Sequence, residues 1–147
     1  MARVVAFLRA INVGGHTVTM ARLKALFEAQ GLGSVETFIA SGNVIFESRA
    51  TRLDRLEATL AAHLEAELGY GVAVFLRTGA ELAAIASHPA FPPGEVRGAY
   101  AVHVAFLGAP PSRAAARTVA GFTTAEDAFH VRGREVYWLC RIRTSDS

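Results

Sequence analysis

The sequence has little of what exported, membrane-spanning or disordered proteins need. Its one cysteine, Cys140, excludes a disulfide within the chain. The apolar runs are about strand length, well short of the roughly 20 residues of a membrane span. The apolar run at the start of the chain is too short to be the hydrophobic region of a secretory signal. Charged residues make up only 19% of the chain and no polar low-complexity tract is present, which argues against disorder. We therefore expect a globular cytoplasmic protein with no membrane partner.

Lysine is almost absent, since Lys24 stands against 14 arginines. Thirteen acidic residues balance these cations to a net charge of +2, which is too small to imply a polyanionic partner unless the charges cluster. What the chain has instead is apolar content. Hydrophobic residues form 52% of its 147 positions, enough for one substantial domain or two small modules that share a core.

The first 77 residues carry the patterns of a strand, a helix, two strands, a helix and a strand. The β-branched and apolar runs predict strands over residues 4–8, 35–39, 44–46 and 72–76. Helical spacing of Leu and Phe predicts one helix capped by Thr19 and ended by Gly31, and another that follows Thr51 and ends at Gly69. This order predicts an α+β, ferredoxin-like βαββαβ unit, with two helices on one face of an antiparallel sheet.

Residues 78–147 predict a second, incomplete ferredoxin-like module. A Thr78/Glu81 capping box opens a helix, and a Pro-rich loop follows over residues 88–93. Beyond it we expect a strand over residues 101–107, a helix over 112–119 and a hairpin of 129–131 with 136–140. Compared with the first module, this one lacks a helix after the hairpin. Because the first strand is apolar on both faces, we expect the rest of the chain to cover the second face of the first sheet.

Three segments resemble the bacterial family known as domain of unknown function 1697. They are Leu8-Arg9-Ala10-Ile11-Asn12-Val13-Gly14-Gly15, the pair Met20 and Leu23, and Ser41-Gly42-Asn43-Val44-Ile45-Phe46. The similarity extends loosely through Arg77-Thr78, Phe91-Pro92 and residues 103–107 to 133–137. The resemblance implies two ferredoxin-like modules, but the activity of the family is not established, so no catalytic residues can be carried over from it.

The loop after the first strand is the sharpest candidate site. Arg9 stands at the strand end, Asn12, Gly14 and Gly15 follow, and a helix begins near residue 20. Helix N-termini and glycine-rich backbone favour anions, and an arginine adds bidentate contacts, so we predict a site for a small anionic or phosphorylated ligand. The simpler interpretation is that the glycines shape a turn and that Arg9 pairs with a carboxylate.

Ser41 and Asn43 join the candidate ligand-binding set, although connectivity leaves open whether they share an end of the sheet with Arg9. The simpler interpretation is a turn in which both side chains bond their own backbone. His16, beside the glycines, is the histidine we would test as an acid or base. A hydrolase or transferase using His16 or Ser41 would need a pocket where both meet Arg9.

Two further alternatives stay open, and no cofactor is expected. Dispersed arginines such as Arg132, Arg134, Arg141 and Arg143 predict a nucleic-acid-binding module, whereas an exposed sheet face predicts a homodimeric scaffold without catalytic activity. The five histidines show no metal-ligand spacing and no dinucleotide or Walker loop is present, so we expect neither a metal nor a cofactor.

Overall fold

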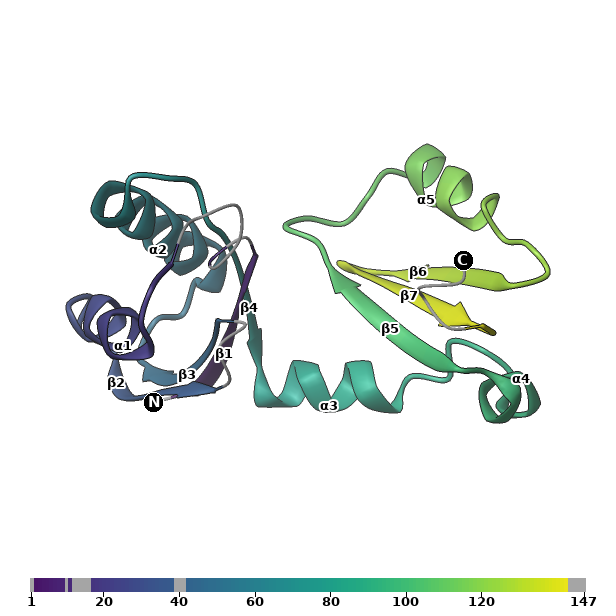
Figure 1. Cartoon of the computed structure of the whole chain (residues 1–147), viewed down its shortest axis with the longest axis horizontal. Helices are drawn as coiled ribbons and strands as arrows, with labels where there is room; N and C mark the ends of the chain where they lie inside the picture. Colours follow the sequence, from purple (N-terminus) through teal and green to yellow (C-terminus); the bar gives the residue numbers. More distant parts are fainter. Residues whose placement is uncertain (1, 10, 12–16, 39–41, 143–147) are drawn as a thin grey trace. The chain divides into compact units, whose positions relative to one another are not determined.

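The computed structural model describes residues 2–9, 11, 17–38 and 42–142 of the chain. This described part holds five helices and seven strands in two antiparallel sheets, so the fold is mixed α+β. The chain divides into two compact units, Met1–Ala86 and Ser87–Ser147, each with its own sheet (Figure 1). The sequence-based boundary between residues 77 and 78 stays a prediction.

The first unit follows the predicted order of elements. Its elements are β1 (Ala2–Arg9), α1 (Met20–Glu28), β2 (Gly33–Phe38), β3 (Asn43–Ser48), α2 (Leu53–Leu68) and β4 (Ala73–Thr78), followed by α3 (Gly79–Ser87). The strands lie in the order β2-β3-β1-β4, and each neighbouring pair is antiparallel. Because β1 and β4 are antiparallel neighbours, the carboxyl end of β1 adjoins the start of β4.

The core of this unit lies between the sheet and helices α1 and α2, which Figure 1 shows on one side of the strands. Alternate residues of β1 point into it, and the register pairs Val4 with Phe46 and Leu8 with Val74 on the same face. Phe27 of α1 packs on Phe46 with ring centroids 5.7 Å apart. Burial of these apolar side chains is the main stabilising contribution to the unit.

The opposite face of the same sheet is also apolar, as the sequence predicted. Val5, Phe7, Ile45 and Phe75 lie there and are half-buried. Arg77 lies on this face opposite Val5 and is completely buried, which the strand pattern gave no reason to expect.

The helix starts confirm two of the expected caps and correct one. Thr19 caps α1, since its hydroxyl accepts a hydrogen bond from the Arg22 amide at 3.1 Å. The Thr78/Glu81 capping box is formed, with the two reciprocal bonds at 2.9 and 3.1 Å. Thr51 does not cap α2. Its N-cap is Arg52, whose guanidinium instead binds the carboxylate of Asp54 at 2.8 and 3.0 Å.

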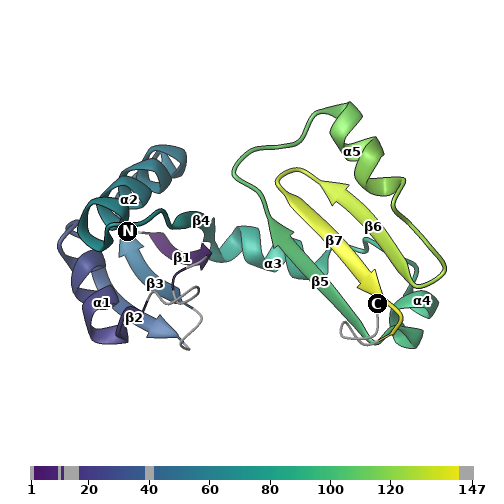
Figure 2. The same ribbon diagram turned by 45° about the horizontal axis from the view of Figure 1, so that its top comes forward.

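The second unit contains a three-stranded sheet in the order β5-β7-β6, seen most openly in Figure 2. Its elements are α4 (Pro93–Gly98), β5 (Ala101–Phe106), α5 (Arg113–Ala120), β6 (Asp127–Arg132) and β7 (Glu135–Cys140). Ser112 caps α5 and Gly133 turns the β6–β7 hairpin with φ of +56°. The short helix α4 replaces the end of the expected Pro-rich loop, because a proline is tolerated in the first turn of a helix.

The lengths and composition of the helices test whether any of them could span a membrane. Among the residues that the structure describes, no helix is both long and apolar enough to cross a bilayer.

Candidate functional site

The carboxyl end of β1 brings together residues that are far apart in the sequence. The register places Phe7 opposite Asn43, the first residue of β3, and Arg9 opposite Ala73, the first residue of β4. Phe38, the last residue of β2, also pairs with Asn43 and is 58% exposed. The ends of β1 and β2 and the starts of β3 and β4 therefore form one edge of the unit. We name this edge the Arg9 edge.

The packing of Gly42 shows that the β2–β3 turn lies at the same end of the sheet as Arg9. It is buried with φ of +91°, and a Cβ atom placed on it would lie 2.5 Å from Cγ2 of Ile11. Ile11 follows Arg9 closely in the chain. The turn before Asn43 therefore packs against the segment after β1, so Asn43 and Arg9 share the same edge.

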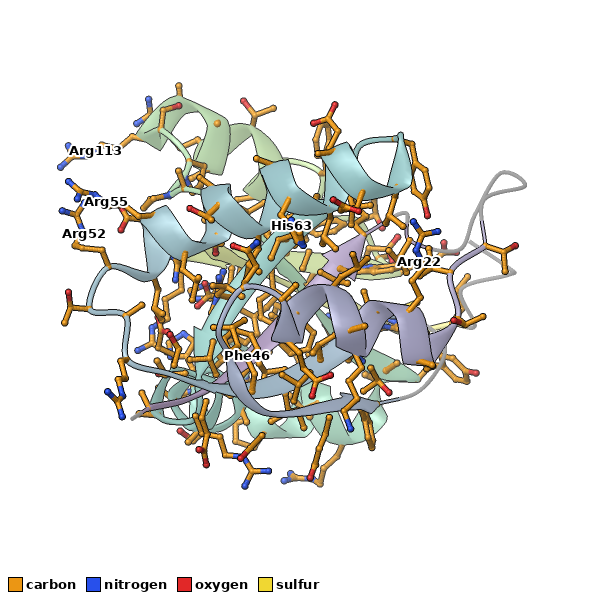
Figure 3. The ribbon with its side chains drawn as sticks, turned by 90° about the vertical axis from the view of Figure 1, so that its left-hand side faces the viewer. Arg22, Phe46, Arg52, Arg55, His63 and Arg113 are labelled. Atoms are coloured by element: carbon orange, nitrogen blue, oxygen red, sulfur yellow. The ribbon has the colours of Figure 1, made fainter. Side chains whose placement is uncertain are left out.

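Two long-range hydrogen bonds lie near this edge, one that reaches Ile11 after β1 and one that joins α1 to the end of α2. The Tyr70 hydroxyl donates to the carbonyl oxygen of Ile11 at 2.7 Å. The Arg22 guanidinium of α1 donates to the carbonyl oxygen of Glu67 at 2.9 Å, near the end of α2 (Figure 3). Neither residue was singled out from the sequence, because a contact across 59 or 45 residues leaves no local pattern.

Arg9 itself is exposed at the edge. Its guanidinium carbon lies 5.8 Å from the centre of the Phe75 ring, a cation–π arrangement. In the described residues no carboxylate lies within salt-bridge distance of Arg9. The described residues therefore hold no ion-pair partner for Arg9 of the kind that the simpler interpretation expected. The guanidinium keeps donors that face solvent and can bind an anion.

An open hollow of about 500 Å³ adjoins Arg9. Its wall is formed by the strand ends, one face of α2 and the segment that leads into β4. The lining residues are Arg9, Ala61, Ala62, Glu65, Gly71, Val72 and Ala73. The small side chains bring the backbone close to the hollow, and Glu65 is the one acidic group among these lining residues.

One N–H group at the N-terminus of α1 is already bonded within the protein. The Thr19 hydroxyl already accepts from the Arg22 amide, so one of the free N–H groups of the first turn is used within the protein. The remaining members of the predicted set, Asn12, Gly14, Gly15, His16 and Ser41, lie outside the described residues. The ligand-binding role of the whole set stays a prediction.

A buried ionic contact was missed by the sequence analysis. The carboxylate of Glu57, on α2, accepts a hydrogen bond from the Leu76 amide at 2.8 Å and lies 3.9 Å from the guanidinium of Arg77. Leu76 belongs to β4, which is an edge strand of the described sheet, and the outward amides of an edge strand need partners other than a strand. Glu57 therefore accepts a hydrogen bond from an amide of the edge strand that has no neighbouring strand, and its negative charge offsets the buried positive charge of Arg77.

In the part of the chain that the structure describes, no group of three or more His, Cys, Asp or Glu side chains is placed to hold a metal ion.

The family model described as Protein of unknown function (DUF1697) matches residues 1–137. A solved structure, that of the conserved bacterial protein SP0830 from Streptococcus pneumoniae, is similar with a TM-score of 0.80 and 23% sequence identity. The match covers 100% of this chain and 81% of that one, and at this identity it shows the fold alone. No curated protein matches.

Proposed function

We propose, starting from the fact that this chain belongs to the family described as Protein of unknown function (DUF1697), that it binds a small anionic or phosphorylated ligand at the Arg9 edge. The observation that carries the proposal is the exposed Arg9 guanidinium beside an open hollow, with no carboxylate partner among the described residues. A charge-assisted bond from a guanidinium to a phosphate or carboxylate is among the stronger polar contacts. The cytoplasmic location expected from the sequence is part of this proposal.

The backbone around Gly71 supports the same proposal. No atom lies within 4 Å of where a Cβ would stand on Gly71, so the backbone there is open to approach. Gly71 and Val72 line the hollow together with Ala73, and Ala73 is the residue that Arg9 pairs with in the sheet. A ligand in the hollow can therefore meet a cation and exposed backbone at once.

Glu65 narrows the class of ligand. A carboxylate in the same hollow repels a multiply charged anion and accepts hydrogen bonds from hydroxyl groups. We therefore favour a ligand that combines one phosphate or carboxylate with hydroxyl groups, such as a sugar phosphate, over free pyrophosphate.

Matched variants at the two ends of β1 test the proposal. Arg9→Gln removes the guanidinium at the edge, whereas Arg3→Gln makes the same change at the other end of the strand, where Arg3 lies 4.0 Å from Glu36 and is exposed. Thermal-shift titrations with sugar phosphates, nucleotides, inorganic phosphate and short RNA then report binding, because a ligand that prefers the native state raises its Tm. We expect a sugar phosphate to raise the Tm of the wild type and of Arg3→Gln, and to have less effect on Arg9→Gln. Equal shifts in all three proteins would refute the role of Arg9.

The nucleic-acid alternative has less support. Arg141, one of the arginines on which it rested, lies 3.6 Å from Glu95, and a paired cation contributes less to phosphate binding. A steep loss of RNA binding with rising salt would favour this alternative. The homodimeric scaffold also stays a prediction, and sedimentation measurements test it.

The ferredoxin-like classification is likewise proposed. The order βαββαβ, the strand order β2-β3-β1-β4 and two helices on one face of the sheet support it for the first unit. In the second unit, β5, α5, β6 and β7 follow one another as β1, α1, β2 and β3 do, which supports an incomplete second copy. Two modules of this kind, divided between residues 77 and 78, remain our proposal.

A further inference from the structure

Two histidines of the second unit converge although 42 residues separate them. His88 follows α3, and His130 lies on β6. Their Nε2 atoms are 3.1 Å apart and their rings stack with centroids at 5.2 Å. Both side chains are half-buried. This pair has no spacing that a sequence motif could report, and it belongs to a different unit from the Arg9 edge.

Neighbouring rings hold the pair in place. Tyr137 of β7 packs against both imidazoles, with centroids 5.4 Å from His88 and 6.0 Å from His130. Phe91 meets the His130 ring edge-on at 6.5 Å. The amide of Ala90 donates to the His88 carbonyl at 2.9 Å, which fixes the backbone of the loop. Both rings are therefore positioned before any ligand arrives, which lowers the entropic cost of binding one.

The surroundings of His88 favour its neutral form. Burial lowers the pKa of His88 below its usual range, and the nearby positive charge of Arg132 and the ring of His130 lower it further. A neutral imidazole has a lone pair on one ring nitrogen, which is what a metal ligand needs.

We propose that His88 and His130 form a two-histidine site for a divalent first-row transition metal such as Zn²⁺ or Cu²⁺. Metal–nitrogen bonds of about 2.0–2.1 Å, at N–metal–N angles between 90° (square-planar) and about 109° (tetrahedral), separate two ligand nitrogens by roughly 2.8–3.4 Å. The observed 3.1 Å lies within this interval. Without metal, one ring donates its Nε2 hydrogen to the other. With metal bound, that ring carries its hydrogen on Nδ1, so two neutral rings release no proton on binding.

The site leaves coordination positions open. No third His, Cys, Asp or Glu among the described residues completes the set, so water or an added ligand supplies the remaining positions. The charge of Arg132 opposes a cation. The affinity is therefore weaker than that of a closed structural zinc site, and Cu²⁺ binds more tightly than Zn²⁺ by the usual order of divalent ions.

Metal titrations of the full chain with matched histidine variants test the proposal. Zn²⁺ binding is measured by calorimetry for the wild type, His88→Ala, His130→Ala and the control His103→Ala. His103 also lies on the sheet of this unit and stacks on Trp138 at 4.9 Å, so the control removes an imidazole that packs on a ring without belonging to the pair. We expect at least a tenfold weaker affinity in each pair variant and the wild-type affinity in His103→Ala. Zn²⁺ binding that is absent in the wild type, or equal in all four proteins, would overturn the proposal.

A second test uses only the wild-type protein, so it does not depend on whether a histidine variant folds. Cu²⁺ bound at the pair shows the electron paramagnetic resonance signature of two equatorial imidazole nitrogens at one equivalent of metal. A spectrum with one nitrogen, or with none, would overturn the two-histidine site even if Zn²⁺ binds. If His130→Ala unfolds, His130→Gln replaces it in the calorimetric series.

Discussion

Gly42 and Ile11 are packed so closely that position 42 has no room for a side chain. A Cβ on Gly42 would approach Cγ2 of Ile11 to 2.5 Å and Cβ of Leu8 to 3.4 Å, and the backbone has φ of +91°. Both constraints act at the Arg9 edge. The packing of the Arg9 edge therefore depends on a glycine that is not among the residues lining the hollow.

Gly42→Ala should destabilise the protein by about 2–4 kcal/mol, since the left-handed backbone costs a side chain roughly 1–2 kcal/mol and the clash adds to it. Gly69→Ala is the control. It has φ of +84° but no atom within 4 Å of its added Cβ, so only the backbone cost of about 1–2 kcal/mol applies. Urea unfolding measures both. Equal losses would show that the contact with Ile11 contributes nothing.

Glu57→Gln should also destabilise the protein, by about 2–4 kcal/mol, because it takes the carboxylate of this pair away from the charge of the buried Arg77. Leu76 keeps a weaker, neutral acceptor. The matched control is Asp54→Asn, which breaks the exposed pair with Arg52 at the start of the same helix. Exposed pairs contribute little, so urea unfolding of this variant should stay close to the wild type. A loss as large as that of Glu57→Gln would contradict the assignment.

Local signals explain which parts of the fold the sequence predicted. The order of the first six elements, the Thr19 cap and the Thr78/Glu81 box follow from apolar spacing and from residues three positions apart. The Thr51 cap failed because Arg52 and Asp54 bind each other across the helix start, an interaction that composition does not reveal.

Long-range contacts explain what the sequence could not predict. Glu57 with Arg77, Tyr70 with Ile11, and His88 with His130 are separated by 20 to 59 residues, so only the folded register and packing bring them together. The candidate site was predicted as a loop motif. Its hollow, with Glu65 and Gly71, comes from α2 and the start of β4, which no motif linked to Arg9.

Glu65→Gln should tighten binding of an anionic ligand at the Arg9 edge, because it removes a negative charge from the lining of the hollow. For inorganic phosphate, which has no sugar hydroxyls to donate to Glu65, we expect at low salt roughly a two- to tenfold lower Kd, the gain expected from one removed like charge near a surface. Glu67→Gln is the control, since the Glu67 side chain is exposed on the same helix and does not line the hollow. The carbonyl oxygen through which Glu67 accepts from Arg22 is unchanged in this variant. Calorimetric titration with inorganic phosphate at two salt concentrations measures the effect, and an unchanged or weaker phosphate affinity in Glu65→Gln would place the anion elsewhere.

Stability should fall as the pH drops through the titration of His88. Its pKa is lowered in the folded protein, first by burial and then by Arg132 and His130, whereas the unfolded chain has the ordinary value of about 6.5. Between these two values the unfolded state binds more protons than the folded one. The stabilising contribution is therefore complete above about pH 6.5 and is lost as the pH falls through the folded-state pKa.

His88→Gln removes this titration, so the Tm of the wild type should fall more steeply than that of the variant between about pH 7.5 and 5. Both series need a chelator, so that bound metal does not compete with protons at the same nitrogens. Parallel Tm curves, or a His88 ring-proton titration by NMR at or above the ordinary value, would show that the packing with His130 and Tyr137 does not favour the neutral ring.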